Sequence, residues 1–321
     1  MTERTIGVAL ASASLLMFAI NIVMTRFAMA RLELDVGFLI AVSVNVLFGI
    51  VAFGGDLWLR HAPLEWDAPA FWLFVLSGVF TTYFGRWFFF ETVARLGPAK
   101  ASTFQISSPM FTALVAWLFL GERLSVTVVA AMVVVISGLY LAGQGPRRPS
   151  SHRLVERSKA GGARVHFRRL RTLTRTLLPA GMLLGLGSSM AYAVGNVLRG
   201  AAIHRWREPV LGALLGALCG VVLHVAFSRT SRRIVESLRE ADRRGLFLYA
   251  IGGVLTISAQ MLTIASMSFI PVSIAALITL CTPIIVIPVS HRLFGREFPV
   301  TPRVIVGSTL ALAGIAAIVL R

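Results

Sequence analysis

Charged side chains are scarce in this sequence. Only 14% of the 321 residues are Asp, Glu, Lys or Arg, whereas soluble globular domains carry about 25%. Hydrophobic residues make up 56% of the chain, and the mean hydropathy is +0.80. So few charges cannot cover the surface of a water-soluble protein of this length, so lipid must surround most of it. A water-soluble enzyme or binding domain is therefore excluded.

Acidic residues and cysteines are also few. The chain has 14 acidic and 31 basic residues, a formal net charge of +17. The basic residues lie in short loops between apolar runs, which indicates membrane orientation and not nucleic-acid binding. Cys219 and Cys281 fall within apolar runs and lack metal-ligand spacing, so we expect packing roles and neither metal nor other cofactor. The phosphate-binding pattern GxxxxGK followed by Ser or Thr is missing, so direct use of ATP is not expected.

Ten apolar runs are long enough to cross a membrane as helices, because a helical crossing needs about 20 residues. They cover residues 5–29, 36–58, 70–93, 98–120, 124–143, 178–203, 209–228, 246–268, 271–291 and 301–320. Continuous apolarity at this length favours helices over a β-barrel, whose strands show about 10 alternating residues. The first run carries Asn21 and Arg26, which the core of a signal peptide avoids. The expected fold is therefore an all-α polytopic membrane protein with ten transmembrane helices.

Basic residues are distributed unequally between the two sides of these spans. When each loop is numbered by the span it follows, the odd-numbered loops hold 22 Lys and Arg residues, and the even-numbered loops and termini hold 6. By the positive-inside rule the odd-numbered loops are cytoplasmic and both termini lie outside. We expect a multi-pass protein of the plasma (bacterial inner) membrane. The most basic loop, residues 144–177, is interpreted as a cytoplasmic linker, with a regulatory or partner-binding role as the alternative.

A repeat relates the two halves of the chain. Pro109 and Gly121 lie twelve residues apart, as do Pro283 and Gly295, and the second pair follows the first by 174 positions. Because five spans is an odd number, the second half enters the membrane with opposite polarity, which makes an inverted-topology repeat. The predicted organisation is a five-helix repeat over 1–143, the linker over 144–177, and a second five-helix repeat over 178–321.

One segment carries a family resemblance. Residues 96–143, LGPAKASTFQISSPMFTALVAWLFLGERLSVTVVAAMVVVISGLYLAG, combine a small-residue turn, Pro109 within a helix, a Gly121-Glu122 pair and a final apolar helix. This order resembles the end of the repeat in EamA-type families of the drug/metabolite transporter superfamily. Residues 18–28, FAINIVMTRFA, resemble the first helix of that repeat, whereas the second half departs from it in Gly295-Arg296-Glu297. The resemblance implies a ten-helix carrier of small metabolites with a central cavity, and it does not fix the substrate.

Polar residues recur at helical spacing on six spans, the first, third and fourth and their counterparts in the second half. Such stripes are costly in lipid unless they face protein or water. We predict that they line a water-accessible site between the halves, with interhelical hydrogen bonding as the alternative. The candidate substrate-binding residues on these stripes are Asn21, Tyr83, Gln105, Ser108, Tyr192, Asn196, Gln260 and Thr279.

Arg86 is the sharpest candidate, because it lies well inside the third span. An arginine at the middle of a membrane helix costs about 2.5–3.5 kcal/mol on insertion scales. We interpret Arg86 as facing the cavity beside Tyr83 and Phe90, where its planar fork binds carboxylate or phosphate. A structural pair with another helix and snorkelling to the surface are the alternatives. Arg26 and Arg199 lie nearer helix ends, and we expect both to snorkel.

These observations predict a secondary transporter that works by alternating access. The expected substrate is an amino acid or another small anionic or zwitterionic metabolite, with export as the direction that the family resemblance favours. A membrane-embedded enzyme or flippase for a lipid-linked substrate is one alternative, although the spans hold no cluster of His, Asp and Cys. A non-transporting partner subunit is another. Besides membrane lipid, the partner considered is a second copy through Gly212, Gly216 and Gly220, whose spacing otherwise favours close packing within one chain.

Overall fold

The computed structural model of the protein describes residues 2–29, 31–32, 34–61, 64–96, 104–143, 180–227, 242–294 and 302–319. The predicted linker, residues 144–177, lies outside this part. Within it, every regular element is a helix. In chain order they are α1 (Glu3–Met29), α2 (Leu34–Arg60), α3 (Ala68–Gly78), the π-helix η1 (Val79–Gly85), α4 (Arg86–Leu96), α6 (Ser108–Leu120), α7 (Val126–Gly143), α9 (Ala180–Arg205), α10 (Pro209–Phe227), α12 (Arg243–Ser266), α13 (Val272–Leu280), α14 (Thr282–Phe294) and α15 (Pro302–Val319).

Six helical stretches in the described part are long and apolar enough to cross a membrane. They are Glu3–Thr25, Val36–Arg60, Ala68–Phe89, Gly181–Arg205, Pro209–Phe227 and Arg243–Ser266. Shorter apolar helices cover Ser108–Leu120, Val126–Leu141, Val272–Val286 and Ile305–Gly314. The predictions of an all-α fold and of a multi-pass membrane protein are confirmed for the described residues. The count of ten spans stays a prediction, because the shorter helices do not by themselves reach the length of a crossing.

The third predicted span is one long helix with a π-helical segment at its middle. Asp67 caps the start of α3 by accepting a hydrogen bond from the backbone N–H of Ala70 at 2.8 Å. The chain then passes without interruption through η1 into α4, which begins at Arg86. Short π-helical segments widen a helix locally and are frequent at functional sites. Arg86, the residue with the predicted binding role, therefore directly follows the π-helical segment.

The fourth and ninth predicted spans are not continuous helices, which corrects the expectation for 98–120 and 271–291. Residues 106–107 form a turn before α6, and Cys281 forms a turn between α13 and α14. Pro109 and Pro283 are the second residues of the helices that follow. Because proline lacks an N–H and its ring clashes with a carbonyl one turn earlier, it ends the preceding helix and starts a new one. The two breaks are 174 positions apart when Ser107 is compared with Cys281.

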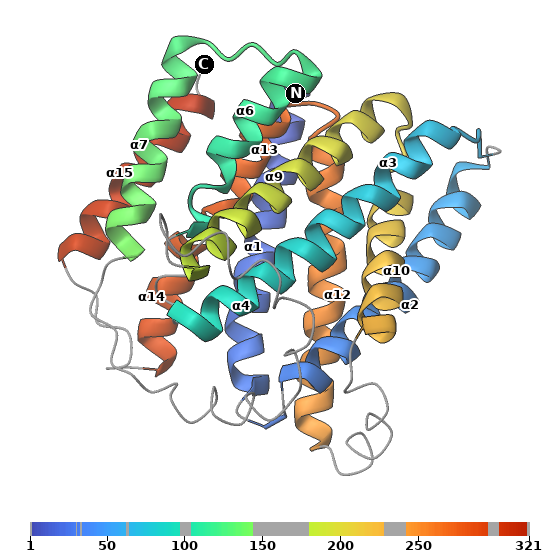
Figure 1. The fold of residues 1–321 in the computed structure, drawn as a ribbon. Coiled ribbons are helices and arrows are strands. Elements are labelled where there is room, and N and C mark those ends of the chain that lie inside the picture. The colour runs from blue at the N-terminus through green and yellow to red at the C-terminus, as the bar shows by residue number, and fades with distance from the viewer. Residues whose placement is uncertain are drawn as a thin grey trace.

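Helices that are far apart in the sequence lie side by side (Figure 1). α1 packs along α12, α9 packs along α3, η1 and α4, and α7 packs along α15 at one edge of the bundle. α2 lies against α10 and α12, while α6 contacts α9 and α13. The side chains buried between these helices are mainly aliphatic, with Phe74, Ile257 and Leu277 fully covered. The interior is therefore formed by contacts between the two halves of the chain.

The glycines of α10 pack against the third span of the same chain. Gly212 faces the ring of Phe74, and Gly220 faces the side chain of Thr82. At Gly216 the backbones come closest, since a Cβ added to Gly78 would lie 2.8 Å from the Gly216 Cα. Small residues permit this approach between membrane helices. The three glycines thus serve packing within the monomer, and a homodimer stays a prediction that no observation here tests.

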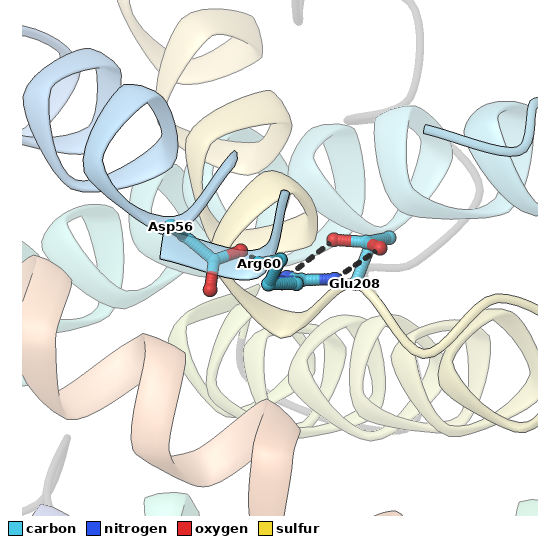
Figure 2. Close-up of polar contacts among 3 residues, drawn as sticks. All are labelled: Asp56, Arg60 and Glu208. Atoms are coloured by element: carbon cyan, nitrogen blue, oxygen red, sulfur yellow. Dashed lines mark hydrogen bonds and ion pairs between the residues drawn. The ribbon is translucent and has the colours of Figure 1, made fainter. Parts of the chain in front are cut away.

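Ion pairs fix the helix ends. Arg60, at the end of α2, holds both carboxylate oxygens of Glu208, at 2.6 and 2.8 Å, and also contacts Asp56 (Figure 2). Glu208 lies in the turn between α9 and α10 and is only 8% exposed. A planar guanidinium that binds both oxygens of a carboxylate is a well-oriented, charge-assisted contact. It ties α2 to the α9–α10 turn.

Candidate functional site

Arg199 is buried in the bundle, so the expectation that it snorkels to the membrane surface is wrong. The side chain on α9 is 6% exposed. Its Nη2 donates to Oγ1 of Thr81 at 3.1 Å and to Oε1 of Gln260 at 2.9 Å. A Cβ added to Gly216 would lie 3.6 Å from that nitrogen, an ordinary contact distance, so the guanidinium lies over α10 at this glycine. The side chain of Arg26, for which the same was expected, lies outside the described residues.

The charge of Arg199 has no acidic partner in the part of the chain that the structure describes. Both of its acceptors are neutral, and its Nε is buried without a hydrogen bond to any described group. Burying an unpaired charge is expensive, and such groups are normally paired or bind a ligand. Arg199 is therefore a functional candidate, although its position near a helix end hides this in the sequence.

Arg86 lies on an aromatic ring of another helix. Its Cζ is 4.2 Å from the ring centroid of Phe38 on α2, a cation–π distance. The Phe38 ring in turn meets the imidazole of His224 edge-on, with centroids 4.8 Å apart. Among the described residues no ion pair joins Arg86 to a carboxylate, Glu91 included. The Arg86 side chain is part-buried.

The described ring contact of Arg86 is with Phe38, which was not among its predicted aromatic neighbours. Tyr83 packs with Phe84, Trp87 and Phe227, at centroid distances of 5.4, 6.1 and 5.6 Å. The side chain of Phe90 lies outside the described residues. Phe38, the observed neighbour, comes from a span that the sequence marks as almost wholly apolar, and no spacing signal connects it with Arg86.

Tyr192 on α9 lies near both guanidiniums. A Cβ added to Gly85 would lie 3.1 Å from the Tyr192 ring, so the tyrosine covers the π-helical segment directly before Arg86. We call Arg86, Tyr192 and Arg199 the arginine–tyrosine cluster. It brings together α4, α9 and, through Phe38 and Gln260, also α2 and α12.

Other predicted site residues are tied into packing networks near this cluster. The Nε2 of Gln105 donates to Oγ of Ser188 at 2.6 Å, and that hydroxyl donates to the Gly85 carbonyl at 2.7 Å. These bonds join the broken fourth span to α9 and η1. Ser108 is buried at the start of α6, and Oγ1 of Thr279 donates to the Ala275 carbonyl at 3.0 Å within α13. For Gln105 the geometry contains the interhelical hydrogen bonding named as the alternative, whereas the bond of Thr279 lies within its own helix.

Asn21 and Asn196 occupy related places on α1 and α9. The Oδ1 of Asn21 is buried without a described partner, 2.7 Å from where a Cβ on Gly252 would lie. Asn196 is part-buried. Beside Asn21, Ser14 donates to the Ala259 carbonyl at 2.8 Å. An unpaired amide oxygen in the interior is a costly group, which keeps Asn21 a site candidate.

Glu122 has a role that the sequence does not reveal. Its carboxylate accepts hydrogen bonds from the backbone N–H of Val272 at 2.6 Å and from Oγ of Ser273 at 2.8 Å. A carboxylate at a helix N-terminus pairs with free N–H groups and with the positive end of the helix dipole. The acid of the Gly121-Glu122 pair thus caps α13, in the other half of the chain. A Pro-x-Ser start at Pro271 is the signal that could have pointed to a capped helix there.

A hollow of about 380 Å³ lies apart from the cluster, at the start of α12. It is lined by Arg31, Arg243, Arg244, Phe247 and Leu248. All three arginines are exposed, and Arg31 already pairs with Asp242 at 3.1 Å. We therefore keep the arginine–tyrosine cluster, whose charges are covered and unpaired, as the candidate site.

Comparison with known proteins gives a family and a fold. A family model described as the EamA-like transporter family matches residues 5–144 and again residues 179–320. No curated relative matches the sequence. One solved structure, titled only as the crystal structure of a protein, superposes with a TM-score of 0.67 at 14% identity and covers 97% of each chain. At that identity the likeness concerns the fold alone.

Proposed function

Since the chain belongs to the EamA-like transporter family, we propose that it is a secondary transporter for a small anionic or zwitterionic metabolite. The resemblance noted for residues 96–143 is confirmed by that membership, and the family is one of membrane transporters and not of enzymes. The substrate would bind at the arginine–tyrosine cluster. The observation that carries this proposal is that two covered guanidiniums, Arg86 and Arg199, have no carboxylate partner in the described part of the chain.

The charge balance of the cluster supports an anionic group on the substrate. An arginine within the membrane costs about 2.5–3.5 kcal/mol on insertion scales. The hydroxyl of Thr81 and the amide of Gln260 accept from Arg199 but carry no charge. A bound carboxylate or phosphate would supply the missing negative charge and fit the planar fork of a guanidinium. Asn21, Asn196, Tyr192 and Gln260 would provide neutral polar contacts around it.

Alternating access would follow from two inverted five-helix repeats, residues 1–143 and 178–321. Two hydrogen bonds support the repeat: Ser14 donates to the Ala259 carbonyl, and Ser188, 174 positions later, donates to the carbonyl of Gly85, 174 positions earlier. The breaks at Ser107 and Cys281 add support, because discontinuous helices at related positions are typical of transporter binding sites. The two halves would rock about the cluster, which would open to one side at a time.

Orientation and direction complete the proposal. Loops with odd numbers, including residues 144–177, would face the cytoplasm of a bacterial inner membrane, and both termini would face outward. Substrate would leave the cell. A tag at the C-terminus should then be accessible from outside intact cells. A tag that becomes accessible only after the cells are permeabilised would overturn this orientation.

Purified protein in liposomes tests the function. A solute that binds the folded state raises its stability by RT ln(1 + [L]/Kd), so a thermal-shift panel of carboxylates, phosphates, amino acids and cations should identify the class, and flux of the hit should follow. Arg86→Gln should lower anion flux at least about tenfold, and Arg86→Lys should retain part of it because only the fork is lost. Arg207→Gln, an exposed arginine, is the control. Equal flux in all variants would exclude Arg86 as an anchor, and lipid turnover without solute flux would indicate an enzyme.

A further inference from the structure

The geometry of the cluster points to a narrower substrate class. We infer that Arg199 is a second anion-binding side chain of the transport site and that the substrate is an organic dianion, held at one end by Arg86 and at the other by Arg199. The inference rests on the proposed function, because it assumes that the cluster binds the substrate. It adds a residue that the sequence places at the membrane surface, and it chooses dianions over zwitterions.

Arg199 has donors to spare for a ligand. A guanidinium carries five N–H donors in a fixed plane. Within the described part of the chain, Nη2 donates to Thr81 and Gln260, and the buried Nε has no hydrogen-bond partner. These two neutral acceptors hold the side chain in one orientation without neutralising it. The charge of Arg199 is therefore held in a fixed place for an anionic group.

The two guanidiniums extend toward different helices. Arg199 contacts Thr81, which precedes Arg86 by five residues along the third span. Arg86 extends toward Phe38 on α2, whereas Arg199 extends over Gly216 on α10. A solute with an anionic group at each end can pair with both.

A zwitterion fits this arrangement poorly. Its carboxylate would neutralise one guanidinium, but its ammonium group would then lie near the second cation, which has no carboxylate paired with it in the described part of the chain. Like charges in a region of low dielectric constant repel strongly. A dicarboxylate, or a carboxylate that also carries a phosphate, neutralises both arginines at once. A monoanion would leave one of the two covered charges unpaired, so it should bind more weakly.

The test uses a matched pair of probes, succinate with two carboxylates and butyrate with one, on the full-length protein in liposomes. For the parent we expect succinate to bind at least about tenfold more tightly than butyrate, because a charged hydrogen-bonded contact is worth about 1.5–3 kcal/mol, and we expect succinate to be transported. Arg199→Gln should lower succinate affinity at least about tenfold, because a hydrogen-bonded charge contact is lost, and should thereby remove the preference for succinate over butyrate. The affinity of Arg199→Lys for succinate should lie between those of the parent and of Arg199→Gln. Arg207→Gln, the same change at an exposed position, should match the parent.

The outcomes separate this inference from the proposed function. Loss of both affinities to the same extent in Arg199→Gln, or an unchanged preference for succinate, would assign Arg199 a structural role and overturn the inference. So would equal binding of butyrate and succinate by the parent. Flux of amino acids without flux of dianions would support the proposed transporter function and would overturn the inference that the substrate is a dianion. If no anion or zwitterion binds the parent, both proposals fail. If Arg199→Gln does not fold, Arg199→Lys becomes the deciding variant. Its preference for succinate over butyrate should be weaker than that of the parent, and an unchanged preference would overturn the inference.

Discussion

The guanidinium of Arg31 lies 3.1 Å from the carboxylate of Asp242 and joins the α1–α2 turn to the start of α12. A second pair, Arg205 with Asp67 at 3.5 Å, joins the end of α9 to the start of α3. The arginines are 174 positions apart and the aspartates 175, and each aspartate also caps its helix by accepting from a backbone N–H. α12 begins at the lower end of the bundle and α3 at the upper end (Figure 1). Equivalent Arg–Asp ion pairs thus lie at both ends of the helix bundle.

Asp242 should give stability a dependence on pH. The Arg31 guanidinium and the Arg244 N–H hold the pKa of Asp242 below its usual value. The folded pKa is the lower one, so the contribution is present above the unfolded pKa and is lost as pH falls through the folded pKa. Between neutral pH and about pH 3, below the usual value near 3.9, the melting temperature of Asp242→Asn should fall less steeply than that of the parent. Glu65→Gln, at an exposed acid, should follow the parent; identical slopes for all three would refute the assignment.

Breaking the Arg60–Glu208 contact should destabilise the protein. In Arg60→Gln the carboxylate of Glu208, 8% exposed, loses a bidentate partner. Losing hydrogen bonds to a covered charge costs about 1–3 kcal/mol. The double variant Arg60→Gln with Glu208→Gln should recover part of this, since no unpaired charge remains. Denaturant unfolding in detergent measures the change, with Arg207→Gln as the control. A double variant less stable than Arg60→Gln alone would contradict the explanation.

The cap that Glu122 places on α13 should be worth more than an ordinary surface contact. Glu122→Gln keeps the shape but removes the charge that pairs with the Val272 N–H and the helix dipole, so about 0.5–2 kcal/mol of stability should be lost. Ser273→Ala, which removes only the hydroxyl bond, should cost less. Thermal unfolding of both variants and of Arg123→Gln, an exposed neighbour, makes the comparison. If Ser273→Ala proves the more damaging, the carboxylate is not the main cap.

Two glycines should respond oppositely to alanine. At Gly78 an added Cβ would meet the Gly216 Cα at 2.8 Å, so α3 and α10 must separate. At Gly54 on α2 nothing lies within 4 Å of an added Cβ. Overpacking of a close contact typically costs about 1–3 kcal/mol, whereas alanine at an open helical site is neutral or favourable. Melting temperatures of Gly78→Ala and Gly54→Ala decide this. Because Arg199 lies over Gly216, anion binding should also weaken in Gly78→Ala; equal behaviour of the two variants would argue against the close crossing.

The length and continuity of the apolar runs were enough to predict membrane helices, because a backbone in lipid must satisfy its hydrogen bonds within the segment. The breaks within the fourth and ninth spans could not be predicted from the sequence in this way. Proline within an apolar run is compatible with a kink or with a full break. At the fourth span, Ser189 on α9 donates to the Phe104 carbonyl at 2.5 Å and satisfies a group near the break. Whether the fourth span breaks thus depends on contacts with a neighbouring helix.

The sequence by itself determined that this chain is a polytopic helical membrane protein of a transporter family, and it singled out Arg86. Only the tertiary structure decided which residues surround that arginine. Spacing along one helix gives depth and face, but Phe38 and Tyr192 reach the site from other helices. Arg199 stays inside because Thr81 and Gln260, on two other helices, accept hydrogen bonds from its guanidinium. Contacts of this kind depend on how closely two helices cross, and that distance is fixed by packing between residues far apart in the sequence.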